Sequence, residues 1–186
     1  MINILTIRNI TKNFDDFADI KSLYKSSFPR NEQTPMFMLL NGARTGKAKF
    51  NAYYDKDLFA GFTYTTVHGD ITCVQYLVVN TNYRSKGYGA KILEAVKEMH
   101  PQNRIALTIE KLDSDAENNE QRIKRRQFYI KNGYEPIGKV LRIFGADYEI
   151  LSCNGVCSAE EFLQVSKNTL GRVLTIIARP KIKEIQ

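Results

Sequence analysis

One stretch in the middle of the chain constrains the fold more than any other feature of the sequence. An apolar run at residues 71–79 leads into a turn with two glycines, Gly87 and Gly89, and then into an amphipathic stretch that stops before Pro101. A second apolar run follows at residues 104–110, where apolar and polar residues alternate as in a strand. A strand, a helix and a strand in this order form a crossover whose two strands lie parallel. The stretch therefore predicts one parallel strand pair.

The remaining strand-like runs predict antiparallel pairing. The polar segments 55–57 and 68–70 are short enough to be hairpin turns. Strands are expected at residues 2–10, 47–55, 58–69, 71–79, 104–110, 134–144 and 146–155. The sequence thus predicts an α+β fold with three layers (alpha-beta-alpha), in which helices cover a mixed, mostly antiparallel sheet with one parallel crossover at its centre.

Capping residues and apolar spacing predict the helices. Besides the helix that Gly87 and Gly89 open, helices are expected at residues 15–28, 119–133 and 158–171. Asp15 or Asp16 is a suitable N-cap for the first, Gly133 suits the C′ position of the second, and Ser158 and Glu161 have capping-box spacing. Residues 36–42 form a short apolar piece after Pro35 without an assigned element, and residues 171–186 stay undecided between strand and tail.

Composition limits the class of protein. The chain has 186 residues, of which 43% are hydrophobic and 25% charged, as in an ordinary globular domain. We expect a single domain over residues 1–186, with a core at about residues 2–153 and a C-terminal helix and tail at 158–186. No apolar stretch approaches the ~20 residues of a membrane helix, so no membrane partner is expected. The first residues lack a signal-peptide pattern, which favours the cytoplasm.

The cysteines predict neither a disulfide framework nor a metal site. Three cysteines leave any disulfide scheme with an unpaired thiol, so reduced thiols are the simplest interpretation. Cys153 and Cys157 have a spacing unlike that of zinc knuckles, and the two histidines, His68 and His100, are isolated. We therefore expect no metal.

The glycine-rich turn has the properties of an anion site. A strand that ends in such a turn and opens a helix exposes backbone N–H groups at the positive end of the helix dipole. Arg84 and Lys86 add cationic donors on the same turn. The alternative is a tight strand-to-helix connection with solvated cations. Neither the Walker pattern nor the dinucleotide-binding glycine pattern fits, since neither the Gly-Lys-Ser/Thr element nor the third glycine is present.

A wider window resembles a known family. Residues 76–93, "YLVVNTNYRSKGYGAKIL", resemble motif A of the GNAT acyltransferase superfamily, in which Arg/Gln-x-x-Gly-x-Gly/Ala opens a helix. Residues 128–135, "FYIKNGYE", resemble that family's second feature, and the predicted order of elements matches its fold up to about Cys153. Asn80 and Thr81 stand where Asp-Pro is common in the family, and the polar insert 111–119 precedes the second motif.

The resemblance implies that acetyl-coenzyme A (acetyl-CoA) is bound as a co-substrate. Backbone amides of the turn would hold the pyrophosphate, and the splayed strand before it would pair with the pantetheine arm. An N–H near Val79 would face the thioester oxygen as it becomes negative. The residues implied are Leu77, Val78 and Val79 on the strand and Arg84, Ser85, Lys86, Gly87, Tyr88, Gly89 and Ala90 on the turn.

The resemblance also implies catalytic residues. Tyr129 resembles the family's tyrosine that protonates the departing thiolate, the alternative being an aromatic ring packed on the sheet. Glu110, at the end of its strand, and Glu32, in the loop region that usually covers the acceptor, are candidate bases. The alternative for each is a solvated or ion-paired carboxylate. Cys73 stands where some relatives keep a glutamate.

The net charge of +7 suits nucleic acid, an anionic membrane surface or a phosphorylated ligand, and cannot choose among them. The basic run of Arg122, Lys124, Arg125 and Arg126 could bind nucleic acid, but a solvated face, or contact with the coenzyme's distal phosphate, is favoured over specific nucleic-acid binding.

The predicted function is direct transfer of an acetyl group from acetyl-CoA to the amine of a small molecule or peptide. The alternative is a non-catalytic module that binds coenzyme A or RNA. A homodimer stays open.

Overall fold

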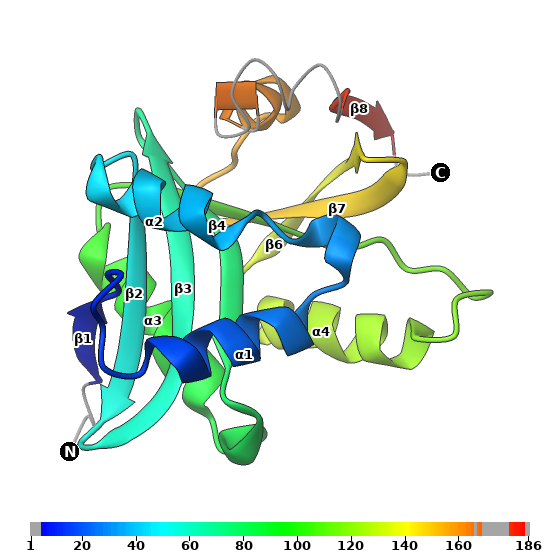
Figure 1. Cartoon of the computed structure of the whole chain (residues 1–186). Helices are drawn as coiled ribbons and strands as arrows, with labels where there is room; N and C mark the ends of the chain where they lie inside the picture. The colour runs from blue at the N-terminus through cyan, green and yellow to red at the C-terminus, as the bar shows by residue number, and fades with distance from the viewer. Residues whose placement is uncertain (1–4, 166, 169–178, 185–186) are drawn as a thin grey trace. The chain divides into compact units, whose positions relative to one another are not determined.

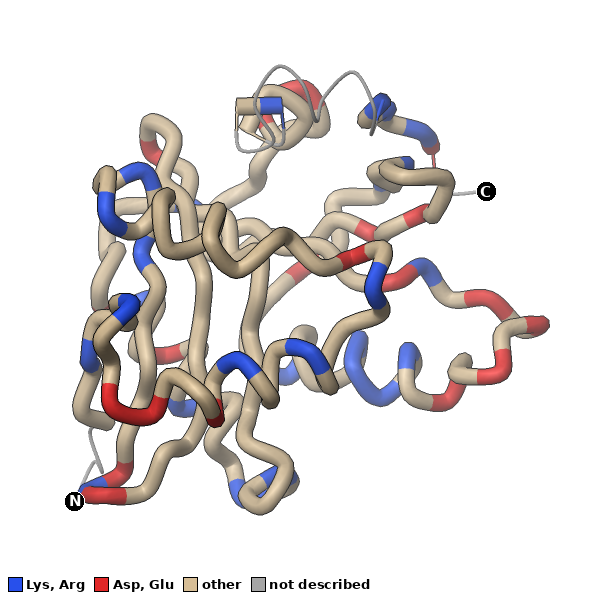
Figure 2. Tube along the Cα trace, viewed as in Figure 1, with Lys and Arg blue, Asp and Glu red and all other residues tan. Residues whose placement is uncertain are grey.

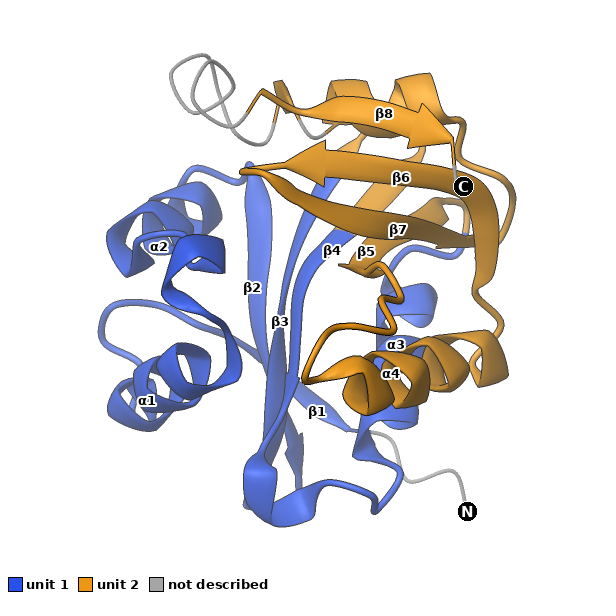
Figure 3. Ribbon diagram, turned by 90° about the vertical axis from the view of Figure 1, so that its right-hand side faces the viewer, with its two compact units in different colours: residues 1–67, 74–101 blue, residues 68–73, 102–186 orange. Residues whose placement is uncertain are grey.

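The computed structural model describes residues 5–165, 167–168 and 179–184. The chain divides into two compact units (Figure 3). Unit 1 consists of Met1–Val67 and Val74–Pro101, and unit 2 consists of His68–Cys73 and Gln102–Gln186. The expectation of a single domain over the whole chain stays a prediction. Among the described residues, no helix is both long and apolar enough to span a lipid bilayer.

Unit 1 is built on the strand order β1-β2-β3-β4 (Figure 1). The strands are β1 (Thr6–Asn9), β2 (Ala48–Asp55), β3 (Leu58–His68) and β4 (Ile71–Val79). β1 and β3 both pair antiparallel with β2, whose register shifts at a bulge between Tyr53 and Tyr54. The hairpin strands expected from the sequence are confirmed, and the first four residues of the chain, which include the start of the expected N-terminal strand, lie outside the described residues.

Helices cover both faces of the unit 1 strands, with α1 and α2 on one face and α3 on the other (Figure 3). They are α1 (Phe17–Ser27), α2 (Met36–Arg44) and α3 (Tyr88–Met99), with two short 3-10 turns, η1 (Arg30–Glu32) and η2 (Thr81–Tyr83). The predicted apolar stripe of α3 is buried at Ile92, Leu93, Ala95 and Val96. The core beneath α1 and α2 is rich in aromatic rings, including those of Phe50 and Phe62.

Two local expectations in unit 1 are corrected. The apolar piece after Pro35 is the helix α2, which is too short for its periodicity to be read from the sequence and buries mainly Leu39. Asp16 occupies the N-cap position of α1, but its side chain makes no capping hydrogen bond. The Asp16 carboxylate instead accepts a hydrogen bond from the hydroxyl of Tyr54.

Unit 2 includes the first residues of β4, Ile71–Cys73, and continues in the strand order β4-β5-β7-β6-β8. The further strands are β5 (Arg104–Glu110), β6 (Glu135–Ile143), β7 (Ala146–Cys153) and β8 (Lys181–Glu184). β7 pairs antiparallel with both β5 and β6, and β8 pairs antiparallel with β6. β4 and β5, which are separated in the chain by α3, form the one parallel pair that the crossover predicted. Part of the undecided C-terminal segment is thus a strand, and residues 171–178 lie outside the described residues.

The two helices that the described residues of unit 2 form end or begin as the sequence predicted. α4 (Asn119–Lys131) is followed by Gly133, which has a left-handed φ of +82°. The C-terminal helix begins at residue 159, after a reciprocal capping box. The Ser158 N–H donates to the carboxylate of Glu161 at 2.8 Å, and the Glu161 N–H donates to the Ser158 hydroxyl at 3.2 Å.

Candidate coenzyme-binding turn and catalytic residues

Asn80 fixes the point at which β4 ends and the glycine-rich turn begins. Its backbone N–H donates to the carbonyl of Ala60 at 2.8 Å, and its side-chain amide donates to the carbonyl of Phe59 at 3.0 Å. The Asn80 side-chain oxygen also accepts from the N–H of Asn82 at 3.2 Å and so caps η2. Asn80, which stands where aspartate is common in the family, therefore holds the start of the turn against β3.

Two residues of the turn have left-handed backbone, Ser85 with a φ of +61° and Gly87 with a φ of +83°. Gly87 is the N-cap of α3, and its carbonyl accepts from the N–H of Lys91 at 3.2 Å. The first N–H groups of a helix have no carbonyl partner within that helix. A Cβ built on Gly87 would meet no atom within 4 Å, so the space beside this backbone is open to a ligand.

The two cations of the turn are not used by the fold. Arg84 and Lys86 are exposed, and neither forms an ion pair with any of the described residues. The Lys86 ammonium lies 5.2 Å from the centre of the Tyr83 ring, which is a cation–π distance. Both charges, together with the dipole of α3, are therefore available to an anion at the turn.

Gly61 on β3 sets the position of the strand that precedes the turn. A Cβ at Gly61 would lie 2.1 Å from the carbonyl oxygen of Val78 on β4, closer than any real Cβ contact. The two backbones can approach only because residue 61 has no side chain. The sequence analysis missed Gly61, since a lone glycine in a strand does not reveal which strand it faces.

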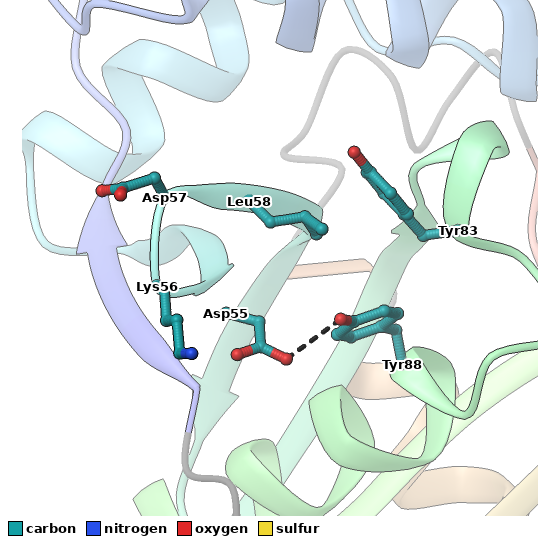
Figure 4. Close-up of a pocket in the computed structure, with 6 residues that line it drawn as sticks. All are labelled: Asp55, Lys56, Asp57, Leu58, Tyr83 and Tyr88. Atoms are coloured by element: carbon teal, nitrogen blue, oxygen red, sulfur yellow. Dashed lines mark hydrogen bonds between the residues drawn. The ribbon is translucent and has the colours of Figure 1, made fainter.

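A pocket of about 640 Å³ adjoins the turn within unit 1 (Figure 4). Its lining residues are Asp55, Lys56, Asp57 and Leu58 on the β2–β3 hairpin, and Tyr83 and Tyr88 on either side of the turn. The Tyr88 hydroxyl donates to the Asp55 carboxylate at 3.0 Å, a bond that raises the pKa of Tyr88. The ammonium of Lys91 lies 3.9 Å from the same carboxylate oxygen. No pattern in the sequence indicated this pocket, because its two walls come from separate elements.

Glu32, one of the two candidate bases, belongs to unit 1, where the hydroxyl of Tyr76 holds its loop. The Tyr76 hydroxyl donates to the Glu32 carbonyl at 2.8 Å and accepts from the N–H of Thr34 at 3.1 Å. The hydroxyl of Tyr24 donates to the carbonyl of Thr34 at 3.0 Å. Two buried tyrosines from different elements thus fix the loop of Glu32, and Glu32 itself is half-buried.

Glu110, the other candidate base, lies in unit 2 with both carboxylate oxygens engaged. Asn118 donates to one oxygen at 3.0 Å, Arg122 lies 3.7 Å from the same oxygen, and Arg125 contacts the other. Burial raises the pKa of Glu110, but the Asn118 hydrogen bond and the two arginine charges outweigh burial and hold the pKa below its ordinary value. A base works best with a pKa near the operating pH. The surroundings of Glu110 favour the ion-paired alternative.

Tyr129 lies on α4 in unit 2 and is half-buried. Its ring packs edge-on against Phe128, with centroids 5.1 Å apart, and against Tyr134, at 5.6 Å. Burial raises the pKa of the Tyr129 hydroxyl to about 12, so the group is protonated at neutral pH. Within the described part of the chain no residue hydrogen-bonds with this hydroxyl. It can therefore donate a proton or a hydrogen bond to a ligand.

The basic run of α4 is paired with carboxylates of its own unit. Arg126 binds Glu149 through two hydrogen bonds of 2.8 and 3.2 Å. Arg122 and Arg125 contact Glu110, as described above. Lys124 is the one cation of the run that forms no ion pair among the described residues. Figure 2 shows these cations on α4 beside the acidic loop that precedes the helix.

The predicted site residues fall into two groups. Unit 1 holds Glu32, the strand residues 77–79 and the turn residues 84–90, and unit 2 holds Glu110 and Tyr129.

Cys73, at the position where some relatives keep a glutamate, is buried, and burial raises the pKa of its thiol to about 12. In the part of the chain that the structure describes, no group of three or more His, Cys, Asp or Glu side chains could hold a metal ion.

The family resemblance is confirmed by comparison with known proteins. Residues 47–136 match the family model described as the acetyltransferase (GNAT) domain. This stretch runs from the start of β2 to the start of β6 and includes the turn and Tyr129. These residues therefore form a GNAT acetyltransferase domain. No curated protein matches the chain in sequence.

Solved structures show the same fold. A protein from Bacteroides thetaiotaomicron, described as an acetyltransferase of the GNAT family, is 22% identical, with a TM-score of 0.70 over 93% of this chain and 98% of that one. An aminoglycoside 6′-N-acetyltransferase complexed with coenzyme A is 16% identical, with a TM-score of 0.61 over 79% of this chain and 95% of that one. A GNAT family acetyltransferase from Elizabethkingia anophelis with acetyl-CoA bound is 13% identical, with a TM-score of 0.56 over 82% and 99%.

Proposed function

We propose that the protein is an N-acetyltransferase that moves the acetyl group of acetyl-CoA to a primary amine by direct attack. The observation that carries the proposal is the exposed turn from Arg84 to Gly89. This turn opens α3 and keeps its cations out of ion pairs with the described residues. Backbone amides and cations at a helix N-terminus are the groups that bind phosphate.

The coenzyme would lie along the end of β4 and across the turn. The backbone amides from Arg84 to Ala90 would hold the pyrophosphate, and the backbone of residues 77–79 would pair with the pantetheine arm. The N–H near Val79 would then face the thioester oxygen and stabilise the negative charge of the tetrahedral intermediate. The coenzyme-bound neighbours support this placement by their shared fold.

Tyr129 is proposed as the general acid. The amine nitrogen attacks the thioester carbon, a C–N bond forms and the C–S bond breaks, leaving the sulfur as a thiolate. The Tyr129 hydroxyl, protonated at neutral pH because burial raises its pKa to about 12, supplies a proton to that sulfur. The amine must lose a proton in turn, because an alkyl ammonium has an ordinary pKa of about 10.4.

Glu32 is proposed as the group that receives this proton, directly or through a water molecule. The hydrogen bonds of Tyr76 and Thr34 fix its loop, and a base must be held in place to act. Glu110 is the weaker candidate, since two arginines and Asn118 occupy its oxygens.

The acceptor is proposed to be a small-molecule amine or a peptide amine. One structural neighbour is an aminoglycoside 6′-N-acetyltransferase, which gives aminoglycosides as a first class to test. All three cysteines are buried, which fits the cytoplasm that we propose as the location of the protein. A homodimer is compatible with the proposal and is not required by it.

The competing function is a non-catalytic module that binds coenzyme A or RNA. The ion pairs of α4 weigh against RNA, because three of the four cations of the basic run are already paired with the carboxylates of Glu110 and Glu149. Any affinity for nucleic acid should be weak, fall steeply with salt and show no sequence preference.

An acetyl-transfer assay separates the two functions. The purified protein is incubated with acetyl-CoA and each member of a panel of amines that includes aminoglycosides, polyamines and lysine peptides. Thiol release above the rate without amine, together with a mass increase of one acetyl group on the amine, is the expected result. Binding of coenzyme A without amine-dependent thiol release across the panel would instead establish the non-catalytic module.

A further inference from the structure

The two ends of the glycine-rich turn are tethered to the same β2–β3 hairpin. Asn80, where β4 ends, is bonded to the start of β3, and Tyr88, where α3 begins, is bonded to Asp55 at the end of β2. We infer that Asn80 and Asp55 are positioning residues for the coenzyme, because together they hold the turn in the conformation that binds phosphate. The inference rests on the proposed function, in which the backbone of the turn binds the pyrophosphate.

The turn between these tethers is exposed and has unusual backbone. Residues 84–87 are all exposed, and Ser85 has a left-handed φ of +61°, which is uncommon for a residue with a side chain. Exposed segments of this kind adopt other conformations easily unless their ends are held. When only a fraction of the molecules has the binding conformation, the apparent Kd rises by the reciprocal of that fraction. Tethers at both ends therefore increase the affinity for coenzyme A without touching it.

Asn80 uses both polar atoms of its side chain. The nitrogen donates to the carbonyl of Phe59 at 3.0 Å, and the oxygen accepts from the N–H of Asn82 at 3.2 Å. The reversed amide would place oxygen against a carbonyl and nitrogen against an N–H, so the two neighbours determine its orientation. An ionised aspartate has acceptors and no donor. Aspartate, which is common at this place in the family, would keep the bond to Asn82 and set a carboxylate oxygen against the Phe59 carbonyl.

Asp55 holds the other end of the turn. The Tyr88 hydroxyl donates to its carboxylate at 3.0 Å (Figure 4), and the Lys91 ammonium lies 3.9 Å from the same oxygen. The Asp55 side chain is only 14% exposed. A negative charge near the start of α3 by itself disfavours phosphate binding. Removal of the Asp55 carboxylate should therefore strengthen binding if only its charge matters, and weaken binding if it holds the turn.

Calorimetry and steady-state kinetics test the Asn80 tether. Asn80→Asp should raise the Kd for coenzyme A about tenfold, which corresponds to a competent turn in about one molecule in ten. With an active amine, the KM for acetyl-CoA should rise in proportion while kcat stays within about twofold, because bound coenzyme holds the turn. The matched control Asn82→Asp adds the same charge at a neighbouring exposed position. It should change the Kd by less than about twofold in salt that screens exposed charges.

Two substitutions of Asp55 test the second tether. Asp55→Asn keeps an oxygen that accepts from the Tyr88 hydroxyl, so this variant should bind coenzyme A no more weakly than the unmodified protein. Asp55→Ala removes the acceptor and should raise the Kd about fivefold, although it removes the same negative charge. Binding of coenzyme A that is tighter for Asp55→Ala than for the unmodified protein would overturn the inference.

Melting temperatures separate a folding defect from a loss of positioning. A folded Asn80→Asp or Asp55→Ala protein with a lower Tm and a Kd within about twofold of the unmodified value would overturn the inference while the proposed function stands. Equal losses for Asn80→Asp and Asn82→Asp would also overturn it, because charge would then explain both. If Asn80→Asp does not fold, the two Asp55 variants decide by themselves. Failure of the unmodified protein to bind coenzyme A at all would overturn the proposed function first.

Discussion

The glycine-rich turn and helix α4 both concentrate basic residues, yet they use them differently. On α4, Arg122 and Arg125 contact Glu110, and Arg126 binds Glu149, whose side chain is only 7% exposed. On the turn, Arg84 and Lys86 are exposed and form no ion pair with the described residues. Basic composition alone therefore does not identify a binding site. Paired cations stabilise the fold that carries them, and unpaired cations are available to a ligand.

The largest effect that the comparison predicts is on the turn. Gly87→Val should abolish coenzyme A binding, because a β-branched side chain disfavours the left-handed backbone and blocks the amides. Losing two charge-assisted hydrogen bonds of roughly 1.5–3 kcal/mol each raises the Kd at least about a hundredfold. Calorimetry measures the loss.

Gly46→Val is the matched control, since Gly46 also has a left-handed φ, +71°, and a Cβ at this position would meet no atom within 4 Å. This variant carries similar backbone strain away from the turn and should bind normally. A folded Gly87→Val protein with unchanged affinity would show that the turn does not hold the coenzyme.

A substitution at Tyr129 tests whether α4 contributes to catalysis without disturbing the ion pairs of the same helix. Tyr129→Phe should cut turnover by about 10²–10⁴-fold, the usual range for a positioned acid, and leave the Kd for coenzyme A unchanged. The ring packing against Phe128 and Tyr134 is retained, so the melting temperature should shift by no more than a few degrees. Steady-state kinetics with an active amine measures the effect. Turnover within twofold of the unmodified enzyme, where chemistry limits the rate, would make Tyr129 a packing residue.

Arg126→Ala should lower stability without changing binding. Glu149 would be left as a nearly buried carboxylate without its arginine, which should reduce the free energy of unfolding by about 2 kcal/mol. Urea unfolding measures the loss, and Lys124→Ala on the same helix is the control that removes a cation without an ion pair. A weakened coenzyme affinity with stability intact would mean that α4 contacts the ligand and that the comparison with the turn fails.

Arg84→Ala should have the opposite profile, with binding weakened and stability retained. Removing one exposed cation from a phosphate site costs about 1 kcal/mol, which raises the Kd for coenzyme A roughly fivefold at low salt. The effect should shrink as salt screens the charge. Lys124→Ala again serves as control, because it lowers the net charge by the same amount. An unchanged Kd at low salt would remove Arg84 from the proposed site.

The smallest effect concerns the pH dependence of stability. The pKa of Glu110 is lowered in the folded protein. The contribution of Glu110 to folding stability is therefore fully present above its unfolded pKa of about 4.3, and it is lost as pH falls through the pKa of the folded protein. Melting temperatures between pH 7 and pH 3 should therefore fall less steeply for Glu110→Gln than for the unmodified protein. The control Glu160→Gln, at an exposed carboxylate, should keep the original slope. Identical slopes for all three proteins would exclude Glu110 as a source of acid sensitivity.

Local patterns in the sequence were sufficient for much of the fold. Alternation of apolar residues located β5 at residues 104–110, and capping chemistry located Gly133 and the Ser158–Glu161 box, because these features depend on neighbours within a few residues. The short helix α2 was missed because nine residues do not establish a helical period.

The candidate site was predictable only where a motif is continuous in the chain. The turn residues lie together in the sequence, whereas the contact between Tyr88 and Asp55 joins residues far apart in the chain. The ion pair between Glu110 and Arg125 also joins residues of separate elements, and its effect on the pKa of Glu110 depends on how β5 and α4 pack. Such contacts arise from packing between elements, which periodicity and spacing do not determine.

The contact between Gly61 and the Val78 carbonyl has a consequence for how this sequence can evolve. Any larger residue at position 61 would push β4 away from β3 and would move the turn with it. In a library of random variants selected for activity, position 61 should therefore be as invariant as position 87, although it would never touch a substrate. A strict glycine at position 61 would then mark the spacing of two strands, because a side chain there would collide with the backbone of β4 rather than with a ligand.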